Sequence, residues 1–491
     1  MNVLTKSSEV KICKFDNSYQ KLPERFYTRL NPTPVKKPEL LRLNLELASQ
    51  LGIEISEHTK DDLTSIFCGN LIPQGANPIA MAYAGHQFGH FTPQLGDGRA
   101  ILLGEILDSS GSRVDVQLKG SGITPFSRQG DGRAALGPVL REYLVSEAMH
   151  ALGIPTTRAL AAAITGEPVY RETVLPGAVL TRVSQSYVRV GTFEFFAVRD
   201  DEKATKILAD YVINRLYPHV SKDKNPYSSL LREVSCRQAK LVAKWMSIGF
   251  IHGVMNTDNM TISGETIDYG PCAFMDSYNP NTVFSSIDTN GRYAYQNQPA
   301  ILVWNLAKLA EALIPLIDEN EKKSIKQLTE VLQLAMPSYQ EYFYKEFCQK
   351  LGLKSVNNKN IKLIEDYLKI LNLESIDFTL SFRDLSKIIN ERLNLNDSIF
   401  AKSKDFNNWY LKWKQEINLN EISDEMDLNN PCYIPRNHLI ENALSKAIEG
   451  DMSEINFMIN LFENPYIQKN ISRKYLMPSN SEEQYVTFCG T

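Results

Sequence analysis

A chain of 491 residues is too long for one simple hydrophobic core, so two or three lobes are expected. Hydrophobic residues make up 43% and charged residues 22%, a soluble globular composition, and a net charge of −4 gives no support for a nucleic-acid partner. The N-terminus lacks the apolar segment of a secretory signal and no run of 18 apolar residues occurs, so we expect a cytoplasmic protein without a membrane span.

The chain begins with strand-poor sequence and then changes to strands. Residues 1–75 mix a helix-like piece with proline-rich connections and are expected to form an N-terminal extension. Residues 98–106 and 113–119 predict two strands joined by the turn LDSSGS. The apolar stripe and Pro138 predict a helix at about 137–152, and 165–184 predicts a second hairpin around a Pro-Gly turn.

From about residue 192 the pattern becomes helical. Apolar residues recur every 3.6 positions in several long segments, and 320–475 is also helical in character. Strands followed by helices predict an α+β chain with a β-rich N-lobe and a helical C-lobe.

Two glycine-rich turns can approach phosphates. Gly96, Gly98 and Arg99 belong to GDGRA at the start of the first strand, where the glycines let the backbone approach a phosphate and Arg99 adds a positive charge. The alternative interpretation is a plain β-turn, and no Walker A motif occurs. Asp131 and Gly132 belong to a second GDGRA that leads into the helix, where the helix dipole favours an anion, unless Asp131 simply caps the helix.

Several charged side chains could hold a phosphate chain. Lys119 ends the second strand and can neutralise phosphate oxygens while a helix glutamate holds it; Glu142 and Glu147 are both candidates, and helical spacing cannot choose between them. Arg182 and Arg189 flank the change from sheet to helix and can clamp a terminal phosphate, although surface salt bridges are the ordinary alternative for either one.

Residues 251–259 and 266–270 resemble a degenerate kinase catalytic loop followed by its metal-binding triplet. His252 and Asn259 keep the outer positions of H-R-D-x-x-x-x-N, whereas Val254 replaces the catalytic aspartate. Asp258 is then the acid that can accept a proton. Asn259 and Asp268, joined by a tight hairpin, supply the hard oxygen ligands that suit Mg²⁺.

The remaining metal and redox candidates are weaker. His86 and His90 have metal-ligand spacing, but no third ligand is evident, and local packing is the favoured interpretation. The seven cysteines contain no C-x-x-C, and an odd, sparse set suits a reducing compartment. Cys272 and Cys489 are interpreted either as two unpaired thiols or as a redox link between the tail and the metal-binding segment.

These motifs together resemble the selenoprotein O family of kinase-like protein adenylyltransferases, in their cysteine-containing, bacterial-type form. The resemblance rests on 83–100, 117–160, 253–276 and 298–313 and is weakest at about 340–430. It implies a protein-kinase-like two-lobed fold with N- and C-terminal extensions, divided as 1–75, a kinase-like N-lobe at 76–190, and a helical C-lobe with both loops and the tail at 191–491.

The resemblance also implies a nucleotide held in a flipped orientation, with the γ-phosphate buried. The family's ATP contacts fall on Gly96, Gly98, Arg99, Lys119, Asp131, Gly132, Arg182, Arg189 and Asp268. Its lysine partner falls on Glu142, its base on Asp258, its Mg²⁺ or Mn²⁺ ligands on Asn259 and Asp268, and its C-terminal redox residue on Cys489.

We therefore expect AMP transfer from ATP to Ser, Thr or Tyr hydroxyls of protein substrates. Three alternatives stay open: ordinary phosphotransfer, UMP transfer with Mn²⁺, and a nucleotide-binding pseudokinase without turnover, which Val254 favours.

Overall fold

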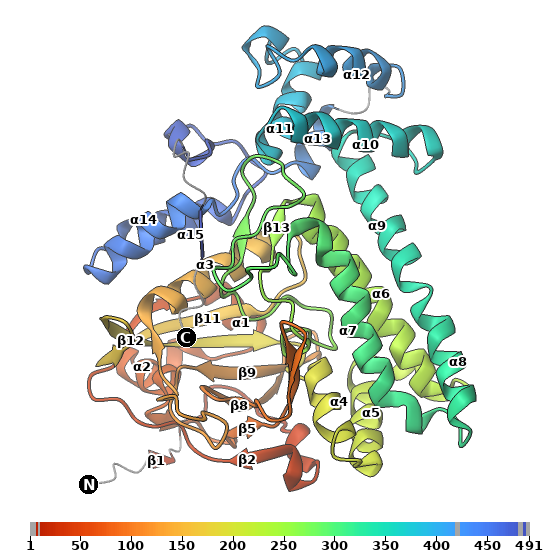
Figure 1. The fold of residues 1–491 in the computed structure, drawn as a ribbon. Coiled ribbons are helices and arrows are strands. Elements are labelled where there is room, and N and C mark those ends of the chain that lie inside the picture. Colours follow the sequence, from red (N-terminus) through yellow and green to blue (C-terminus); the bar gives the residue numbers. More distant parts are fainter. Residues whose placement is uncertain (1–5, 8–9, 418–422, 480–484, 488–491) are drawn as a thin grey trace.

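A computed structural model describes residues 6–7, 10–417, 423–479 and 485–487. A β-sheet region formed by the first part of the chain lies beside a helical region formed by the second part (Figure 1). The predicted α+β, two-lobed architecture is confirmed.

One antiparallel sheet, with strands of different lengths, forms most of the N-lobe. Its strand order is β2-β5-β8-β9-β12-β11-β3, with β10 paired to β12. The strands are β2 (Tyr27–Arg29), β3 (Glu39–Leu43), β5 (Ile79–Met81), β8 (Ala100–Leu107), β9 (Arg113–Lys119), β10 (Ala134–Ala135), β11 (Arg158–Tyr170) and β12 (Val174–Ser184). Three two-stranded sheets are formed by β1 (Lys6–Ser7) with β4 (Leu71–Ile72), β6 (Gly85–Gln87) with β7 (His90–Thr92), and β13 (Phe250–Ile251) with β14 (Ala273–Phe274).

The helices fall into an N-terminal set and a larger C-terminal set. The first set is α1 (Leu45–Gln50), α2 (Lys60–Cys68) and α3 (Leu136–Ala151). The second set is α4 (Val190–Ala197), α5 (Glu202–Leu216), α6 (Pro226–Ser247), α7 (Gln298–Leu313), α8 (Glu321–Leu332), α9 (Ala335–Lys350), α10 (Asn358–Leu373), α11 (Phe378–Ile389), α12 (Lys404–Lys414), α13 (Ser423–Asn429), α14 (Asn437–Ile448) and α15 (Ser453–Phe462).

The sheet is buried on both faces because successive residues of a strand point in opposite directions. Leu102 and Leu180 belong to the core shared with α3, whereas Leu103 and Val179 belong to the core beneath α1 and α2. The central strands β8 and β9 are accordingly buried on both faces, and their buried positions include the polar residues Glu105, Asp115 and Gln117. Packing against the sheet positions α3, and α3 carries Glu142 toward the cavity.

The two predicted hairpins occur, with one difference in the second. β8 and β9 pair around the expected turn. β11 and β12 turn at 171–173, where the Arg171 amide donates to the Thr173 carbonyl, and the predicted Pro176-Gly177 turn lies inside β12. Pro176 lies opposite Pro168 in the ladder, next to the register shift between Ile164 and Pro168, an irregular position of the kind where a strand accommodates proline.

The segment before residue 76 contributes two strands to the central sheet. β2 pairs with β5, and β3 pairs with β11 at the opposite edge. These are pairings between distant parts of the chain, which local sequence patterns do not reveal. The boundaries at 75 and 190 stay a prediction.

The helical region packs around α6 and returns to the N-lobe at its end. α6 contacts α7, α8 and α9, while α14 and α15 pack on α3 (Figure 1). The helical pattern that begins at about residue 192 is divided into α4 and α5 near Asp200, whose φ is 53°.

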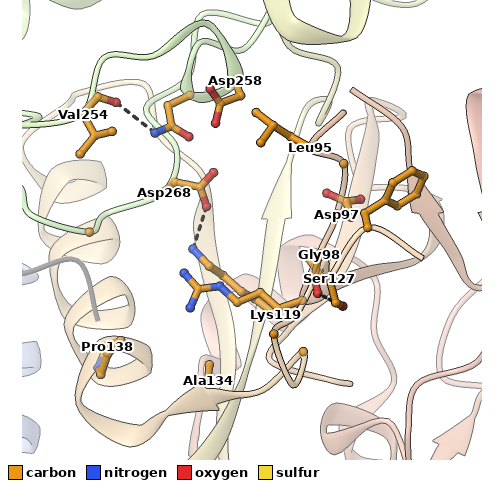
Figure 2. A pocket seen from close by; sticks show the side chains of 18 of the residues that line it. Leu95, Asp97, Gly98, Lys119, Ser127, Ala134, Pro138, Val254, Asp258 and Asp268 are labelled. Atoms are coloured by element: carbon orange, nitrogen blue, oxygen red, sulfur yellow. Dashed lines mark hydrogen bonds and ion pairs between the residues drawn. The ribbon is translucent and has the colours of Figure 1, made fainter. Parts of the chain in front are cut away.

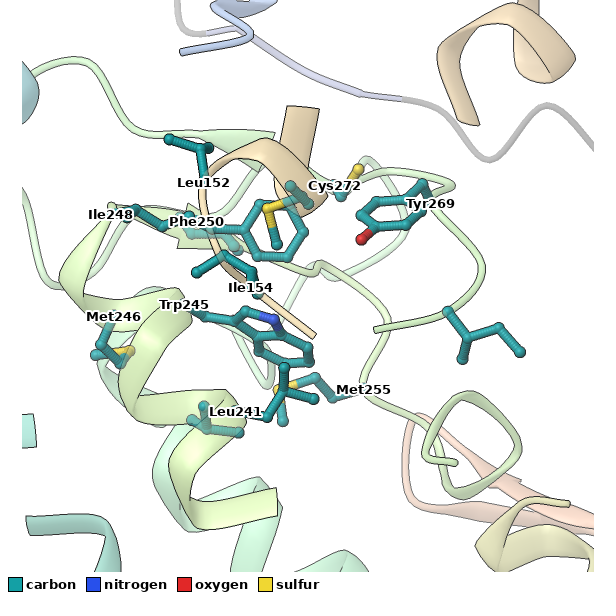
Figure 3. Close-up of a cluster of buried hydrophobic side chains, with 14 of the residues drawn as sticks. Leu152, Ile154, Leu241, Trp245, Met246, Ile248, Phe250, Met255, Tyr269 and Cys272 are labelled. Carbon is teal, nitrogen blue, oxygen red and sulfur yellow. The ribbon is translucent and has the colours of Figure 1, made fainter. Parts of the chain in front are cut away.

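A hydrophobic cluster supports the loops between β13 and β14. Trp245, Phe250, Met255, Tyr269 and Cys272 lie together beneath these loops (Figure 3). The Trp245 indole also donates to Thr266 Oγ1 at 2.9 Å, which ties α6 to the second loop. The loops are therefore held from below by packing rather than by regular secondary structure.

One segment among the described residues, Tyr295–Leu316, is long and apolar enough to cross a membrane by length and composition. Its mean hydropathy is 1.4 and half of it is buried in the protein. A core helix passes the same test, and α7 within this segment packs against α4 and α6, so the segment is weak support for a membrane span.

Candidate active site

A cavity of ≈ 480 Å³ lies between the sheet and the loops that follow α6 (Figure 2). It is lined by all the residues that the sequence assigned to nucleotide, metal or proton transfer: Gly96, Gly98, Arg99, Lys119, Asp131, Gly132, Glu142, Arg182, Arg189, Asp258, Asn259 and Asp268. Residues from the sheet, from α3 and from both loops thus meet at one place.

A cluster of ion pairs forms the deep end of this cavity. Lys119 Nζ lies 2.6 Å from Glu142 Oε2 and 2.7 Å from Asp268 Oδ1. Arg182 Nη1 lies 2.8 Å from Glu142 Oε1 and 2.7 Å from Asp268 Oδ1. Arg189 Nη1 lies 2.8 Å from Asp268 Oδ2. Three cations therefore share two carboxylates, and Asp268 contacts all three.

The cluster keeps its charges although it is buried. Burial opposes ionisation of Asp268, but Arg182, Lys119 and Arg189 outweigh it and hold the pKa of this carboxyl well below its usual value. Burial likewise opposes ionisation of Glu142, and Lys119 and Arg182 outweigh it and lower the pKa. Against Glu142 and Asp268 alone the three cations have one positive charge in excess, and the neighbouring Asp97 beside Arg189 offsets it.

Helical spacing left two partners for Lys119, and the structure places only Glu142 beside it. Glu147 instead accepts from Arg158 Nε at 2.9 Å and from the Ala159 amide at 2.8 Å. It fixes the start of β11 and lies outside the cavity.

Asp97 is a buried carboxylate beside Arg189 that the sequence interpretation did not single out. Its Oδ2 accepts from the Met81 amide at 3.0 Å, and Oδ1 lies 3.9 Å from Arg189 Nη2. Burial raises the pKa of Asp97 to about 6, against the opposing effect of Arg189. Asp97 is therefore an additional counter-ion for the cation cluster.

The first glycine-rich turn needs its glycines because of one neighbour, Phe126. A Cβ on Gly96, whose φ is +72°, would lie 2.3 Å from the Phe126 ring, and one on Gly98 would lie 2.9 Å from the Phe126 carbonyl oxygen. Arg99 follows and makes no ion pair within the described residues. The turn thus brings bare backbone and an arginine to the cavity wall.

The second glycine-rich turn lines the cavity, but Asp131 does not have the capping role that was one of its two interpretations. The N-cap of α3 is Ala135. The two Asp131 oxygens accept from Arg171 Nη1 at 2.9 Å and Nη2 at 3.1 Å, and one also accepts from the Arg133 amide. Arg171, in the β11–β12 turn, also lines the cavity and was not identified from the sequence.

Asp258 lies in a short 3-10 turn (Thr257–Asn259) and is largely withdrawn from water. Burial raises the pKa of Asp258 to about 7, against the opposing effect of Arg189. Arg189 Nη1 donates to the Asp258 carbonyl at 2.6 Å, so the same arginine fixes the backbone here and binds Asp268. A carboxyl with this pKa suits proton exchange near neutral pH.

Asn259 and Asp268 both line the cavity and fit a magnesium ion. The Asn259 amide nitrogen donates to the Val254 carbonyl at 3.0 Å, which leaves its oxygen as the available ligand atom. Among the described residues no group of three or more His, Cys, Asp or Glu could hold a metal. Two hard oxygen ligands are nevertheless enough where phosphates and water complete the octahedron.

The histidine and cysteine candidates are placed elsewhere. His86 and His90 belong to the β6–β7 hairpin, where His86 Nδ1 lies 2.5 Å from Glu194 Oε1 and His90 is exposed. Cys272 is buried beneath the loops, and burial raises the pKa of its thiol to about 11. Cys489 lies outside the described residues, although Thr487 Oγ1 donates to the Pro271 carbonyl at 2.6 Å, next to Cys272.

Comparison with known proteins gives consistent matches over the chain's length. The family model described as protein adenylyltransferase SelO matches residues 9–463. Protein nucleotidyltransferase YdiU of Maridesulfovibrio salexigens is 51% identical and covers 98% of this chain and 99% of its own length. The protein of the same name from Bacillus cereus strain B4264 is 50% identical and covers 99% of this chain and 100% of its own.

Among solved structures, one similarity is to ROP2 from Toxoplasma gondii, described as a virulence factor with a protein-kinase fold and no enzymatic activity. It is 12% identical, covers 65% of this chain and 84% of its own, and has a TM-score of 0.25, which is too low to bear on the interpretation.

Proposed function

The chain belongs to the protein adenylyltransferase SelO family and is a protein nucleotidyltransferase, and from that premise we propose that it transfers AMP from ATP to Ser, Thr or Tyr hydroxyls of proteins. In this proposal ATP binds with its γ-phosphate inward. Pyrophosphate is the second product.

The observation that carries the proposal is the depth of the cation cluster. The side chains of Arg182 and Arg189 are only 2% and 3% exposed, and Lys119 lies beside them. The most highly charged part of ATP is its terminal phosphates, so the inner end of the cavity favours them. The α-phosphorus then lies nearer the mouth, where an acceptor hydroxyl can reach it.

Proton transfer falls to Asp258. The acceptor oxygen forms a bond to the α-phosphorus, the bond from that phosphorus to the bridging oxygen breaks, and pyrophosphate leaves with the electron pair. Asp258 takes the hydroxyl proton. Such reactions need little covalent help from the protein, so positioning and charge neutralisation supply most of the acceleration.

The other residues bind and orient the nucleotide. Lys119, Arg182 and Arg189 hold the pyrophosphate end, with Glu142 orienting the first two. The turns at Gly96-Gly98-Arg99 and Asp131-Gly132 line the rest of the cavity. Mg²⁺ or Mn²⁺ held by Asn259 and Asp268 would supply positive charge against the phosphate oxygens.

Two labelled forms of ATP test the proposal. Label in the α-phosphate is expected to enter protein, and label in the γ-phosphate is expected to leave as pyrophosphate. Transfer of the γ-label instead would establish ordinary phosphotransfer, preferential use of UTP with Mn²⁺ would establish UMP transfer, and nucleotide binding without any pyrophosphate would establish a pseudokinase.

We also propose a cytoplasmic location, and for Cys272 and Cys489 both alternatives stay open, two unpaired thiols or a redox link. The sparse, odd set of cysteines supports a reducing compartment. The contact of Thr487 with Pro271 supports an approach of the tail to Cys272. Alkylation of both thiols with and without reductant tests the link, and equal labelling under both conditions would exclude it.

A further inference from the structure

The β6–β7 hairpin lies directly against the loop that carries Asp258. The His86 amide donates to Thr257 Oγ1 at 2.7 Å, and the Phe88 amide donates to Asn256 Oδ1 at 3.1 Å. Between them, Gln87 Nε2 donates to Asp258 Oδ2 at 3.3 Å. Three consecutive hairpin residues thus contact three consecutive loop residues.

The approach is close enough to exclude even a methyl group. A Cβ on Gly85 would lie 2.6 Å from Asp258 Oδ1 and 2.9 Å from its Cβ. This contact restricts the Asp258 side chain on one side, while the Gln87 amide holds it on another. The carboxylate therefore has little freedom to rotate.

The hairpin is itself fixed by other elements. His86 Nδ1 lies 2.5 Å from Glu194 Oε1 on α4, and its ring meets Trp304 of α7 edge-on with centroids 5.1 Å apart. The Phe88 ring packs on Tyr293, whose hydroxyl donates to Asn256 Oδ1 at 2.6 Å. Gln87 is thus presented from a rigid support, as a positioning group requires.

The two oxygens of Asp258 are left in different conditions. Oδ2 accepts from Gln87, whereas Oδ1 is buried and has no hydrogen-bond partner among the described residues. Because Oδ1 is packed against Gly85 and withdrawn from the cavity, Oδ2 is the oxygen left for an incoming hydroxyl, and Gln87, which donates to it, also lines the cavity that such a hydroxyl enters.

We propose that Gln87 is a positioning residue for the transfer reaction, which donates to Oδ2 of Asp258 and so holds this carboxylate in one orientation toward the acceptor hydroxyl. This inference rests on the proposed function, because it needs an acceptor hydroxyl at Asp258. Gln87 itself does not exchange a proton with the substrate. It acts by fixing the orientation of the carboxylate.

The test compares Gln87→Ala and Gln87→Leu with a matched control, Gln94→Ala, which changes an exposed glutamine outside the cavity. Transfer of label from α-labelled and γ-labelled ATP is measured to the protein itself and to casein. ATP affinity is measured separately by calorimetry, and folding by thermal unfolding.

The two Gln87 variants are expected to lower kcat by about 10- to 100-fold while the Kd for ATP changes less than about twofold, since only the orientation of the base is lost. Gln94→Ala is expected to match the wild type. Wild-type kcat in both Gln87 variants, or a loss explained by weaker ATP binding, would overturn the inference. If the wild-type protein transfers neither label, the proposed function fails instead.

Discussion

Removing the charge of Asp268 is expected to destabilise the nucleotide-free protein and to abolish AMP transfer. Asp268 contacts Lys119, Arg182 and Arg189 at 2.7–2.8 Å, and without it these cations are left with Glu142 and the more distant Asp97. Breaking a buried ion pair by removing one partner costs about 3–5 kcal/mol. Asp268→Asn keeps the shape of the side chain, so the lost stability reports the charge.

A polyanion is expected to restore the lost stability. In the wild-type protein a phosphate chain must displace Asp268 from the three cations, whereas in Asp268→Asn the cations lack that competitor. Metal-free tripolyphosphate should therefore raise the thermal midpoint of the variant more than that of the wild type. Differential scanning fluorimetry in EDTA, with and without tripolyphosphate, measures both shifts, and α-labelled ATP measures transfer.

Asp377→Asn is a matched control, because Asp377 is also buried and accepts from Arg436 at 2.8 Å far from the cavity. It should lower the midpoint without any enhanced response to tripolyphosphate. Equal responses of wild type and Asp268→Asn would refute the reasoning about the cluster. Persistent AMP transfer in Asp268→Ala would show that the metal assignment is wrong.

Three further outcomes are expected. Burial raises the pKa of Glu265 from 4.5 to about 7, so between these pH values the folded protein keeps a proton that the unfolded chain releases, and the free energy of unfolding falls as pH rises. Glu265→Gln should remove about 3 kcal/mol of this fall. If the difference in free energy of urea unfolding between pH 5 and pH 8 is the same in the variant and the wild type, this prediction is contradicted. Burial lowers the pKa of Lys350 from 10.5 to about 7, so the free energy of unfolding should rise with pH between these values. Lys350→Met should be more stable than the wild type at pH 7, and the difference in stability between the two proteins should narrow at pH 9.5. A difference in urea midpoint that is the same at both pH values would argue against the pKa shift. Both oxygens of Asp268 contact cations, so Mn²⁺ should bind tightly only together with a non-hydrolysable ATP analogue. Electron paramagnetic resonance measures the free Mn²⁺. If adding the protein without nucleotide already removes the signal of free Mn²⁺, binding of the metal does not depend on the nucleotide and the prediction is wrong.

The parts of the fold with strong local patterns could be predicted from sequence. β9 has its predicted bounds, and α3 differs by one residue at each end. The beginning of β11 could not be predicted because Ala161, Ala162 and Ala163 have little intrinsic preference for a strand. All three are fully buried, so the helices on both faces of the sheet determine their conformation.

The site could be predicted only where a motif fixes a residue's place. Lys119 and the two loops follow from motif spacing, but helical spacing could not choose Glu142 over Glu147. The family resemblance chose Glu142, and the path of β11 supplies the physical reason, because Arg158 on that strand binds Glu147. The sequence does not predict a role for Gln87, because the metal-ligand spacing in HQFGH points only to its two histidines. The signal was present, since alternation in a short hairpin turns Gln87 away from His86.

The backbone at Asp268 is held in one conformation in the absence of any nucleotide. Its φ is +58°, a left-handed conformation that costs energy for a residue other than glycine and persists only when its surroundings fix it. The three ion pairs do so from one side, and buried Tyr269, hydrogen-bonded to Thr156, does so from the next position. Because the backbone is already fixed without nucleotide, phosphates and metal need only exchange partners with the side chain. The site is therefore preorganised, which is where most of the acceleration of a phosphorus transfer is expected to arise.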